Sequence, residues 1–192
     1  MWLSILNKRH YLFALILLLL FPYGCSSKYK VISHEYTQYE GEANQHTRII
    51  NAGADHVFRI LTHEKLFQEA CPKGTIVTHE SPPPYQPGTL IKTQIDHIFK
   101  LEWHTQVEEV ISPKKIRLRF LDGFFEGGRE IWELEDIEGK TRATQTIIVH
   151  PKGIIRNIFW LLKVRMKHDK MLEAFLDNLK SLAEKHSFQI EQ

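Results

Sequence analysis

The sequence predicts an α+β domain, in which an antiparallel sheet of about seven strands curves round a long C-terminal helix, with two short helices after the first strand. Two observations carry this prediction. From Thr75 to Val149, apolar and polar residues alternate in short runs separated by turns, which is typical of an antiparallel sheet with one covered face. From Ile154 to His186, apolar residues recur every three or four positions, which indicates a helix. A lone long helix after such a sheet suggests that the two enclose a pocket.

The N-terminal part of the domain predicts one strand and two short helices. Gln45–Asn51 has the composition of a strand, and Gly53–Leu61 has apolar residues at helical spacing. A second helix is expected over His63–Ala70, with Thr62 as its N-cap. It ends before Pro72, because proline disfavours helical backbone in the residue that precedes it.

Six further strands are expected in the alternating region. Their ranges are Thr75–His79, Thr89–Asp96, Leu101–Val110, Ile116–Phe120, Glu130–Glu135 and Thr141–Val149. Short turns join them, so strands that are adjacent in sequence should pair as neighbours. Every second side chain should face the covered side of the sheet. Trp103, Phe120 and Trp132 fall on that side.

The composition is that of an ordinary globular domain. The chain has 192 residues, of which 43% are apolar and 25% are charged, and this is enough to bury a core. A net charge of +2 gives no reason to expect a nucleic-acid partner. The two cysteines, Cys25 and Cys71, provide no disulfide framework if Cys25 is modified. Cys71 then fits a small buried side chain better than a reactive thiol.

The N-terminus resembles an export signal of the bacterial lipoprotein type. Lys8 and Arg9 precede an apolar run, Tyr11–Phe21, which is shorter than the roughly 20 residues that a membrane span needs. Small residues follow, and the resemblance implies that Cys25 becomes the lipidated first residue. Pro22 departs from the pattern, because leucine is usual at this position. An uncleaved N-terminal anchor is the alternative.

These features divide the chain into three parts. Residues 1–24 are expected to form the signal peptide, residues 25–44 a polar tether, and residues 45–188 the ligand-binding domain. The expected location is the bacterial cell envelope, with the protein exported and anchored in the membrane by lipid.

Several motifs in the domain resemble those of a known superfamily. They are IINAGADHVFRILT at 49–62, PGTLIKT at 87–93, W-x-x-x-V-E-E at 103–109, DGFFEGGREIWELED at 122–136, G-x-T-R-A-T at 139–144 and LKSLAE at 179–184. Together with the order of elements, they are similar to the START-like or SRPBCC superfamily, whose fold is called the helix-grip fold. This superfamily includes lipid-transfer domains and proteins of the polyketide cyclase/dehydrase type. The resemblance covers Gln45 to His186, and it implies an apolar cavity between the sheet and the long helix.

Common catalytic and metal-binding motifs are absent from the sequence. It has no G-x-S-x-G turn, no glycine-rich phosphate loop and no H-E-x-x-H motif. The nearest metal-like cluster is Asp96, His97 and His104, which fits scattered surface residues better than a site. We therefore expect no catalytic residues, no metal and no cofactor.

The walls of the expected cavity can be assigned residue by residue. The expected ligand-binding residues are Trp103, Phe120 and Trp132 from the sheet and Leu162, Met166, Asp169 and Leu172 from the helix. Large aromatic side chains at such positions suit a greasy or flat ligand. A core that is filled by the same side chains is the alternative.

Asp169 is the one charged residue on the apolar stripe of the helix. A buried carboxylate must be paired, protonated or solvated, because burial of an unpaired charge costs several kcal/mol. One hypothesis places Asp169 in the cavity, where it meets a polar group of the ligand or an internal water. The alternative is that it reaches solvent at the edge or pairs with Arg165 one turn earlier.

The first half of the long helix has the composition of a membrane-surface segment. Between residues 152 and 170, six basic residues stand against one acidic residue, and most of the remaining residues are apolar. Such a segment is suited to anionic lipid. Arg156, Phe159, Trp160 and Lys163 are the expected membrane contacts, and ordinary packing is the alternative.

The predicted function is non-catalytic binding or transfer of a hydrophobic small molecule, such as a lipid, an isoprenoid or a polyketide-like compound. The expected partners are this molecule and a membrane surface. One alternative is a cyclase/dehydrase-like enzyme that uses Asp169 or Glu130 as an acid or base. Another is a protein-interaction module that uses the helix end and the proline loop at 82–84.

Overall fold

The computed structural model of the protein describes residue 36 and residues 38–96, 101–149, 153 and 160–187. All of them belong to one compact unit, Ser33–Gln192. The expected signal peptide, Cys25 and most of the tether lie outside the described residues. So do Arg156 and Phe159, two of the four expected membrane contacts.

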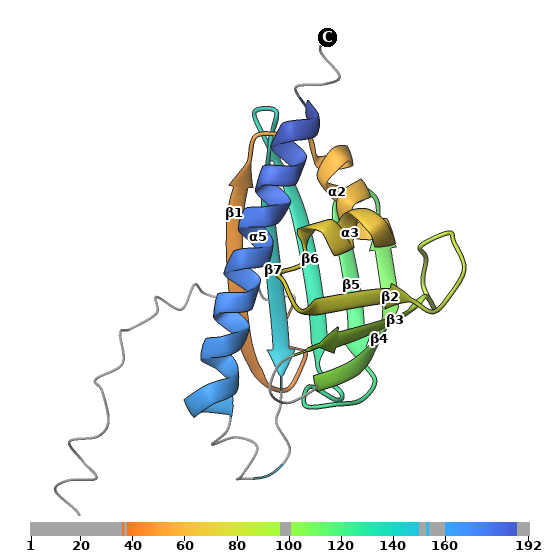
Figure 1. The fold of residues 1–192 in the computed structure, drawn as a ribbon, viewed down its shortest axis with the longest axis vertical. Coiled ribbons are helices and arrows are strands. Elements are labelled where there is room, and N and C mark those ends of the chain that lie inside the picture. Colours follow the sequence, from red (N-terminus) through yellow and green to blue (C-terminus); the bar gives the residue numbers. More distant parts are fainter. Residues whose placement is uncertain (1–35, 37, 97–100, 150–152, 154–159, 188–192) are drawn as a thin grey trace, which may run out of the picture. The chain divides into compact units, whose positions relative to one another are not determined.

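The described chain forms seven strands and three α-helices, with one π-helical turn before the last helix (Figure 1). The elements are β1 Glu42–Ile50, α2 Ala54–Thr62, α3 Glu64–Ala70, β2 Thr75–His79, β3 Leu90–Ile95, β4 Leu101–Ile111, β5 Lys115–Phe120, β6 Arg129–Ile137, β7 Lys140–Val149, η2 Trp160–Val164 and α5 Arg165–Ser187. This order confirms the predicted α+β fold class. β1 begins three residues earlier than predicted, so Glu42–Asn44 of the expected tether belong to the sheet.

The seven strands form a single antiparallel sheet in the order β1-β7-β6-β5-β4-β3-β2. The strands from β2 to β7 form the predicted meander. β1 pairs with β7 along its whole length, from Glu42 opposite Val149 to Ile50 opposite Thr141. The first and last strands are therefore neighbours, and β1 and β2 form the two edges.

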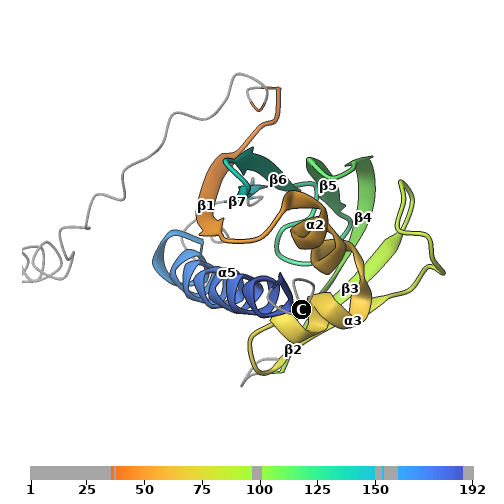
Figure 2. The same ribbon diagram turned by 90° about the horizontal axis from the view of Figure 1, so that it is seen from above.

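The sheet curls, and the helices lie within the curl (Figure 2). α5 packs beside β1 and contacts α2 and α3, while α3 lies against β2. The pairing of β4 with β5 shifts its register between Val107 and Glu109. A bulge of this kind bends its strand and increases its twist, which helps the sheet to curve.

The core lies between the sheet and the helices. α5 contributes Leu172, Phe175, Leu176, Leu179 and Ala183, all of them buried. Leu172, Leu176, Leu179 and Ala183, which recur at the predicted helical spacing, therefore face inward.

At the N-terminal end of the helix, the predicted stripe is wrong. Leu162 and Met166 are 55% and 57% exposed, whereas Trp160 is 1% exposed. A π-helical turn rotates less per residue than an α-helix, so η2 brings Trp160 toward the sheet and turns Leu162 away. Met166 lies in the regular helix α5, six residues before the buried Leu172 and so about 120° from it round the helix axis, which turns Met166 outward.

One predicted cap is also wrong. The residue before α3 is His63, whose side chain makes no capping hydrogen bond. The Thr62 hydroxyl instead donates to the carbonyl of Phe58 at 2.9 Å, within α2. Thr62 is the last residue of α2, so its hydroxyl is used there and is not turned toward α3.

Candidate ligand cavity

Two adjoining hollows lie between the curled sheet, α3 and α5. The larger has about 610 Å³ of space between atoms, part of which is open to solvent, and the smaller has about 390 Å³ on the same measure. They share five lining residues, namely Phe67, Val77, Thr93, Glu130 and Trp132. The walls are mostly apolar, as in ligand pockets generally.

Four of the seven expected ligand-binding residues line the larger hollow. These are Trp103, Phe120, Trp132 and Leu172. Phe125, which the sequence analysis did not select, stands among them, with ring-centroid distances of 6.0 Å to Trp103 and 5.2 Å to Phe120. The alternation of the strands thus placed the aromatic wall correctly. The role of these residues in binding a ligand stays a prediction.

Glu130 is the acidic group of the cavity and borders both hollows. It faces inward with Trp132, because side chains two residues apart on a strand share a face. The Trp132 indole nitrogen donates to Glu130 Oε1 at 2.8 Å. Burial raises the pKa of Glu130, and hydrogen bonds from Trp132 and Gln145 together with the charge of His168 offset part of this rise. Burial thus favours a protonated carboxyl group.

Other polar side chains surround Glu130. Burial, aided by the charge of Glu130, raises the pKa of Tyr85 and raises that of the Cys71 thiol to about 12. Both groups are therefore neutral at pH 7, and a reactive thiol at Cys71 is disfavoured. Gln145 is 2% exposed, and its Oε1 atom has no hydrogen-bond partner among the described residues. The cavity thus has a polar centre in an apolar wall.

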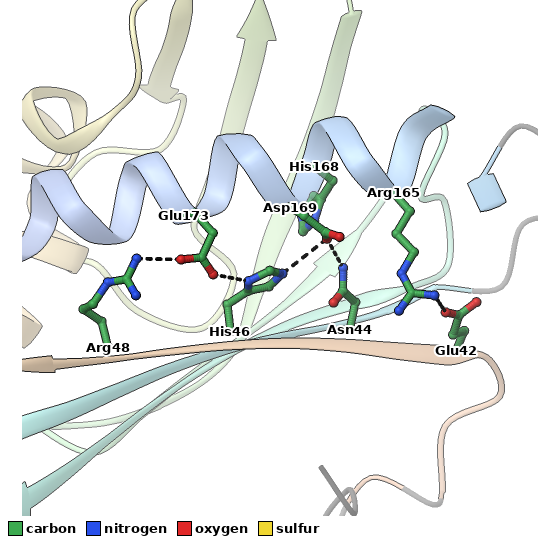
Figure 3. Close-up of polar contacts among 8 residues, drawn as sticks. All are labelled: Glu42, Asn44, His46, Arg48, Arg165, His168, Asp169 and Glu173. Carbon is green, nitrogen blue, oxygen red and sulfur yellow. Dashed lines mark hydrogen bonds and ion pairs between the residues drawn. The ribbon is translucent and has the colours of Figure 1, made fainter. Parts of the chain in front are cut away.

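Asp169 lies outside the wall of the cavity and faces β1, where Asn44 Nδ2 donates to it at 2.5 Å (Figure 3). His46 Nε2 lies 3.3 Å from the same oxygen, Oδ1. Asp169 is therefore not in the expected position in the cavity. It is 35% exposed, which agrees with the alternative of reaching solvent at the edge. The alternative partner is wrong, because Arg165 donates to Glu42 at 2.6 Å. Burial acts to raise the pKa of Asp169, but the nearby His168, Asn44 and His46 outweigh burial and lower its pKa to about 2. At 3.8 Å, His168 acts on this carboxylate through its proximity and not through a hydrogen bond.

Asp169 is one member of a polar seam that joins β1 to α5 (Figure 3). The seam comprises Glu42, Asn44, His46 and Arg48 on β1 and Arg165, Asp169, Glu173 and Asp177 on α5. Two residues along a strand span about 6.6 Å, and four residues along a helix span about 6 Å. The two spacings nearly match, so each polar residue of one element meets a partner on the other.

The structure corrects one of the expected membrane contacts. The Trp160 side chain packs in a buried cluster with Phe120, Phe125, Ile147 and Val149. Its indole nitrogen donates to Glu42 Oε2 at 3.1 Å. Trp160 is therefore a core residue, which agrees with the alternative of ordinary packing.

Lys163 is exposed, as a membrane contact requires. Within the part of the chain that the structure describes, no helix is long and apolar enough to cross a lipid bilayer.

The histidine cluster that the sequence analysis set aside does not assemble among the described residues. His104 Nδ1 contacts Asp122 Oδ2 at 2.6 Å, and His97 lies outside the described residues. A different group, His46, His168 and Asp169, brings its ligand atoms within 4.8 Å of one another. No local pattern in the sequence indicates this group, because its members come from β1 and α5, which lie more than a hundred residues apart.

Comparison with solved structures gives the same fold. The protein TTHA0849 from Thermus thermophilus aligns with a TM-score of 0.61 at 15% identity, over 76% of this chain and 99% of its own. The protein NE0264 from Nitrosomonas europaea aligns with a TM-score of 0.59 at 16% identity, over 76% and 96%. The Aha1 dimer from Colwellia psychrerythraea aligns with a TM-score of 0.55 at 16% identity, over 74% and 96%.

These neighbours are members of the helix-grip superfamily, and the fold of this chain is the helix-grip fold, as the sequence resemblance implied. At these identities the likeness establishes the fold alone. No family model and no curated protein sequence matches the chain.

Proposed function

We propose that the domain binds a hydrophobic small molecule in the cavity between the sheet and α5 and releases it unchanged. The observation that carries the proposal is the composition of the cavity wall. Trp103, Phe120, Phe125 and Leu172 provide apolar surface, and Glu130 provides a polar point at the junction of the two hollows. A wall of this kind buries an apolar body and orients it through few hydrogen bonds.

The wall also suggests the chemistry of the ligand. A lipid, an isoprenoid or a polyketide-like compound with one hydroxyl or carbonyl group would place its apolar part against the aromatic wall. Its polar group would meet Glu130 and the unpaired Oε1 of Gln145. Because that oxygen is buried without a partner among the described residues, a ligand that donates a hydrogen bond to it gains stability.

A cyclase-like enzyme is the second candidate, and Glu130 is the observation that favours it. A buried carboxyl with a raised pKa can serve as a general acid. Acid-base catalysis also needs a second group that can accept or donate a proton nearby. Tyr85 and Cys71 border the cavity, but the raised pKa of each keeps its proton at neutral pH. The histidines that border the cavity, His79 and His168, are the groups that could fill this role. The mostly apolar wall makes binding without reaction our first choice.

A substitution that fills the cavity tests the proposal. Thr93 borders both hollows, so Thr93→Phe should occupy the space of the ligand and weaken binding by about tenfold or more. The matched control is Thr78→Phe, because Thr78 is an exposed residue of the neighbouring strand β2. Native mass spectrometry of each protein, purified from its own host without detergent, measures the retained ligand.

The outcomes of this experiment separate the candidates. Retention by the wild type and by Thr78→Phe, with loss in Thr93→Phe, supports binding in the cavity. Equal retention by both folded variants contradicts it. Conversion of the retained compound to a new mass during incubation identifies the enzyme.

The location of the protein is a further part of the proposal. We propose that it is exported and anchored by lipid on Cys25 in a bacterial envelope membrane, with the start of the C-terminal helix facing the bilayer. The sequence of the N-terminus supports the anchor, and the exposed Leu162, Met166 and Lys163 support the orientation. Labelling with a fatty-acid analogue should mark the wild type and leave Cys25→Ser unmarked. Equal labelling of both proteins would overturn the anchor.

A further inference from the structure

Three metal-ligand side chains meet within the seam between β1 and α5. His46 comes from β1, while His168 and Asp169 are consecutive residues of α5 (Figure 3). Asp169 Oδ1 lies 3.3 Å from His46 Nε2 and 3.8 Å from His168 Nδ1, and all three ligand atoms lie within 4.8 Å of one another. His168 also borders the larger hollow, whereas His46 and Asp169 are not among its lining residues.

His168 is the residue that the protein contacts alone do not explain. Its side chain is 8% exposed, and its Nδ1 atom is buried without a hydrogen-bond partner among the described residues. At 3.8 Å the Asp169 oxygen is too far for a hydrogen bond. A buried ring nitrogen without a partner costs free energy, and native structures seldom leave one in that state. The orphan atom belongs to the same group as the Asp169 carboxylate and His46 Nε2.

The separations suit a tetrahedral metal ion. Zinc binds histidine nitrogen and carboxylate oxygen at about 2.0–2.2 Å, so two ligands of a tetrahedral site lie about 3.3 Å apart. The distance from His46 to Asp169 has this value. His168 is farther from both, 3.8 Å from Asp169 and within 4.8 Å of His46, so an ion would draw its ring closer. Three protein ligands leave a fourth position open, as in zinc sites that bind water. Asp169 is 35% exposed, so that position can be reached from solvent.

The residues behind the ligands hold them in place. Glu173 Oε1 lies 2.5 Å from His46 Nδ1 and Arg48 donates to Glu173 Oε2 at 2.6 Å. A histidine that donates its Nδ1 hydrogen to a carboxylate presents Nε2 to a metal as a free lone pair. Asn44 fixes the Asp169 carboxylate in the same way from the other side. The carboxylates of Asp169, Glu173 and Asp177, set against Arg48, make the surroundings favourable for a cation.

We propose that His46, His168 and Asp169 bind a divalent transition-metal ion, with zinc as the best match, and that the bound ion fastens α5 to the edge strand β1. Binding gives the orphan nitrogen of His168 a partner. It also ties together two elements that are distant in sequence, so the ion should stabilise the folded state and not the unfolded chain.

The test titrates the full chain, after treatment with chelator, with zinc chloride in a calorimeter and with cobalt chloride in a spectrophotometer. We expect one tight equivalent of zinc, the visible absorption of tetrahedral cobalt, and a rise in the melting temperature on addition of zinc. His46→Gln and His168→Gln should each weaken binding by more than about 100-fold and remove the rise. Glu173→Gln, which removes the carboxylate behind His46 and its ion pair with Arg48, should weaken binding by about tenfold.

His104→Gln is the matched control, because His104 is also a half-buried histidine paired with a carboxylate, but it lies on β4. This variant should bind zinc as the wild type does. Failure of the wild type to bind one equivalent overturns the proposal. Binding that survives both His46→Gln and His168→Gln in folded protein overturns it as well, because the ion then sits elsewhere. If a variant fails to fold, Asp169→Asn, which retains the shape of the side chain, replaces it in the comparison.

Discussion

At the scale of single residues, Glu130 has the clearest link between position and chemistry. Side chains alternate in direction along β6, so Glu130 points inward beside Trp132. A carboxyl group thus occupies an inward-facing position at which an apolar residue is usual. The domain keeps this costly group at the junction of two hollows. Departures of this kind from the sequence pattern are expected at functional sites, which is why Glu130 is central to the proposed function.

The pKa of Glu130 predicts how stability depends on pH. Because burial raises its pKa above the ordinary value of 4.5, the folded protein holds a proton that the unfolded chain has already lost. The contribution of this bound proton to the free energy of unfolding is complete below pH 4.5, and it is lost as the pH rises through the higher pKa of Glu130 in the folded state. Glu130→Gln retains an oxygen that accepts from Trp132 and does not titrate. The wild type therefore loses stability as pH rises, whereas Glu130→Gln does not. The difference between their free energies of unfolding should shift in favour of the variant by at most about 1.4 kcal/mol per pH unit.

Urea unfolding of both proteins between about pH 4 and 8, in the presence of chelator, measures this difference. Chelator removes any contribution from a metal bound near His168. A gap between the two proteins that stays constant across the series would show that the pKa of Glu130 does not shift on folding.

At the scale of elements, the last helix buries the predicted side chains in its second half but not at its start, where η2 lies. Leu176 is fully buried in the core, whereas Leu162, which the sequence placed on the same stripe, is 55% exposed. Leu176→Ala should lower the free energy of unfolding by about 3 kcal/mol, because it removes packed methyl groups and leaves a cavity. Leu162→Ala should change it by less than about 0.5 kcal/mol.

Denaturant unfolding of the two variants checks the phase of the helix directly. They carry the same substitution, so differences in side-chain chemistry cancel. Comparable losses of stability in both would mean that the π-helical turn does not rotate Leu162 away from the sheet.

The elements also show where sequence patterns suffice and where they fail. The strands and short helices begin and end within about three residues of their predicted bounds, because alternation and turn residues act locally. The π-helical turn has no comparable local signal, so Leu162 and Trp160 were misplaced. Met166 was misplaced because two successive steps of three residues separate it from Leu172, which carries it off the buried face of the helix. Asp169 was misplaced for a different reason, since its partners on β1 become visible only when the strand lies beside the helix.

At the scale of the whole molecule, the sequence predicted the apolar wall of the candidate site better than the polar residues within it. The curled sheet, the helix and the aromatic wall followed from periodicity and from the helix-grip resemblance. Glu130 was named only as an alternative acid or base, and Gln145 was missed. Gln145 stands in the polar run Thr144–Thr146 of a strand whose residues are nearly all buried. Polar residues within such a strand are the signal that could have found the polar centre.

The pairing of β1 with β7 has a consequence for the order in which the chain can fold. The first strand lies at the start of the domain, and its sheet partner begins about ninety residues later, at Lys140. The polar seam adds contacts between β1 and α5 that span an even longer stretch of chain. Closing such long loops costs entropy before the contacts repay it, so assembly is slow compared with that of a helical bundle. A chain emerging from the ribosome therefore keeps β1 without a partner until nearly all of the domain has been synthesised.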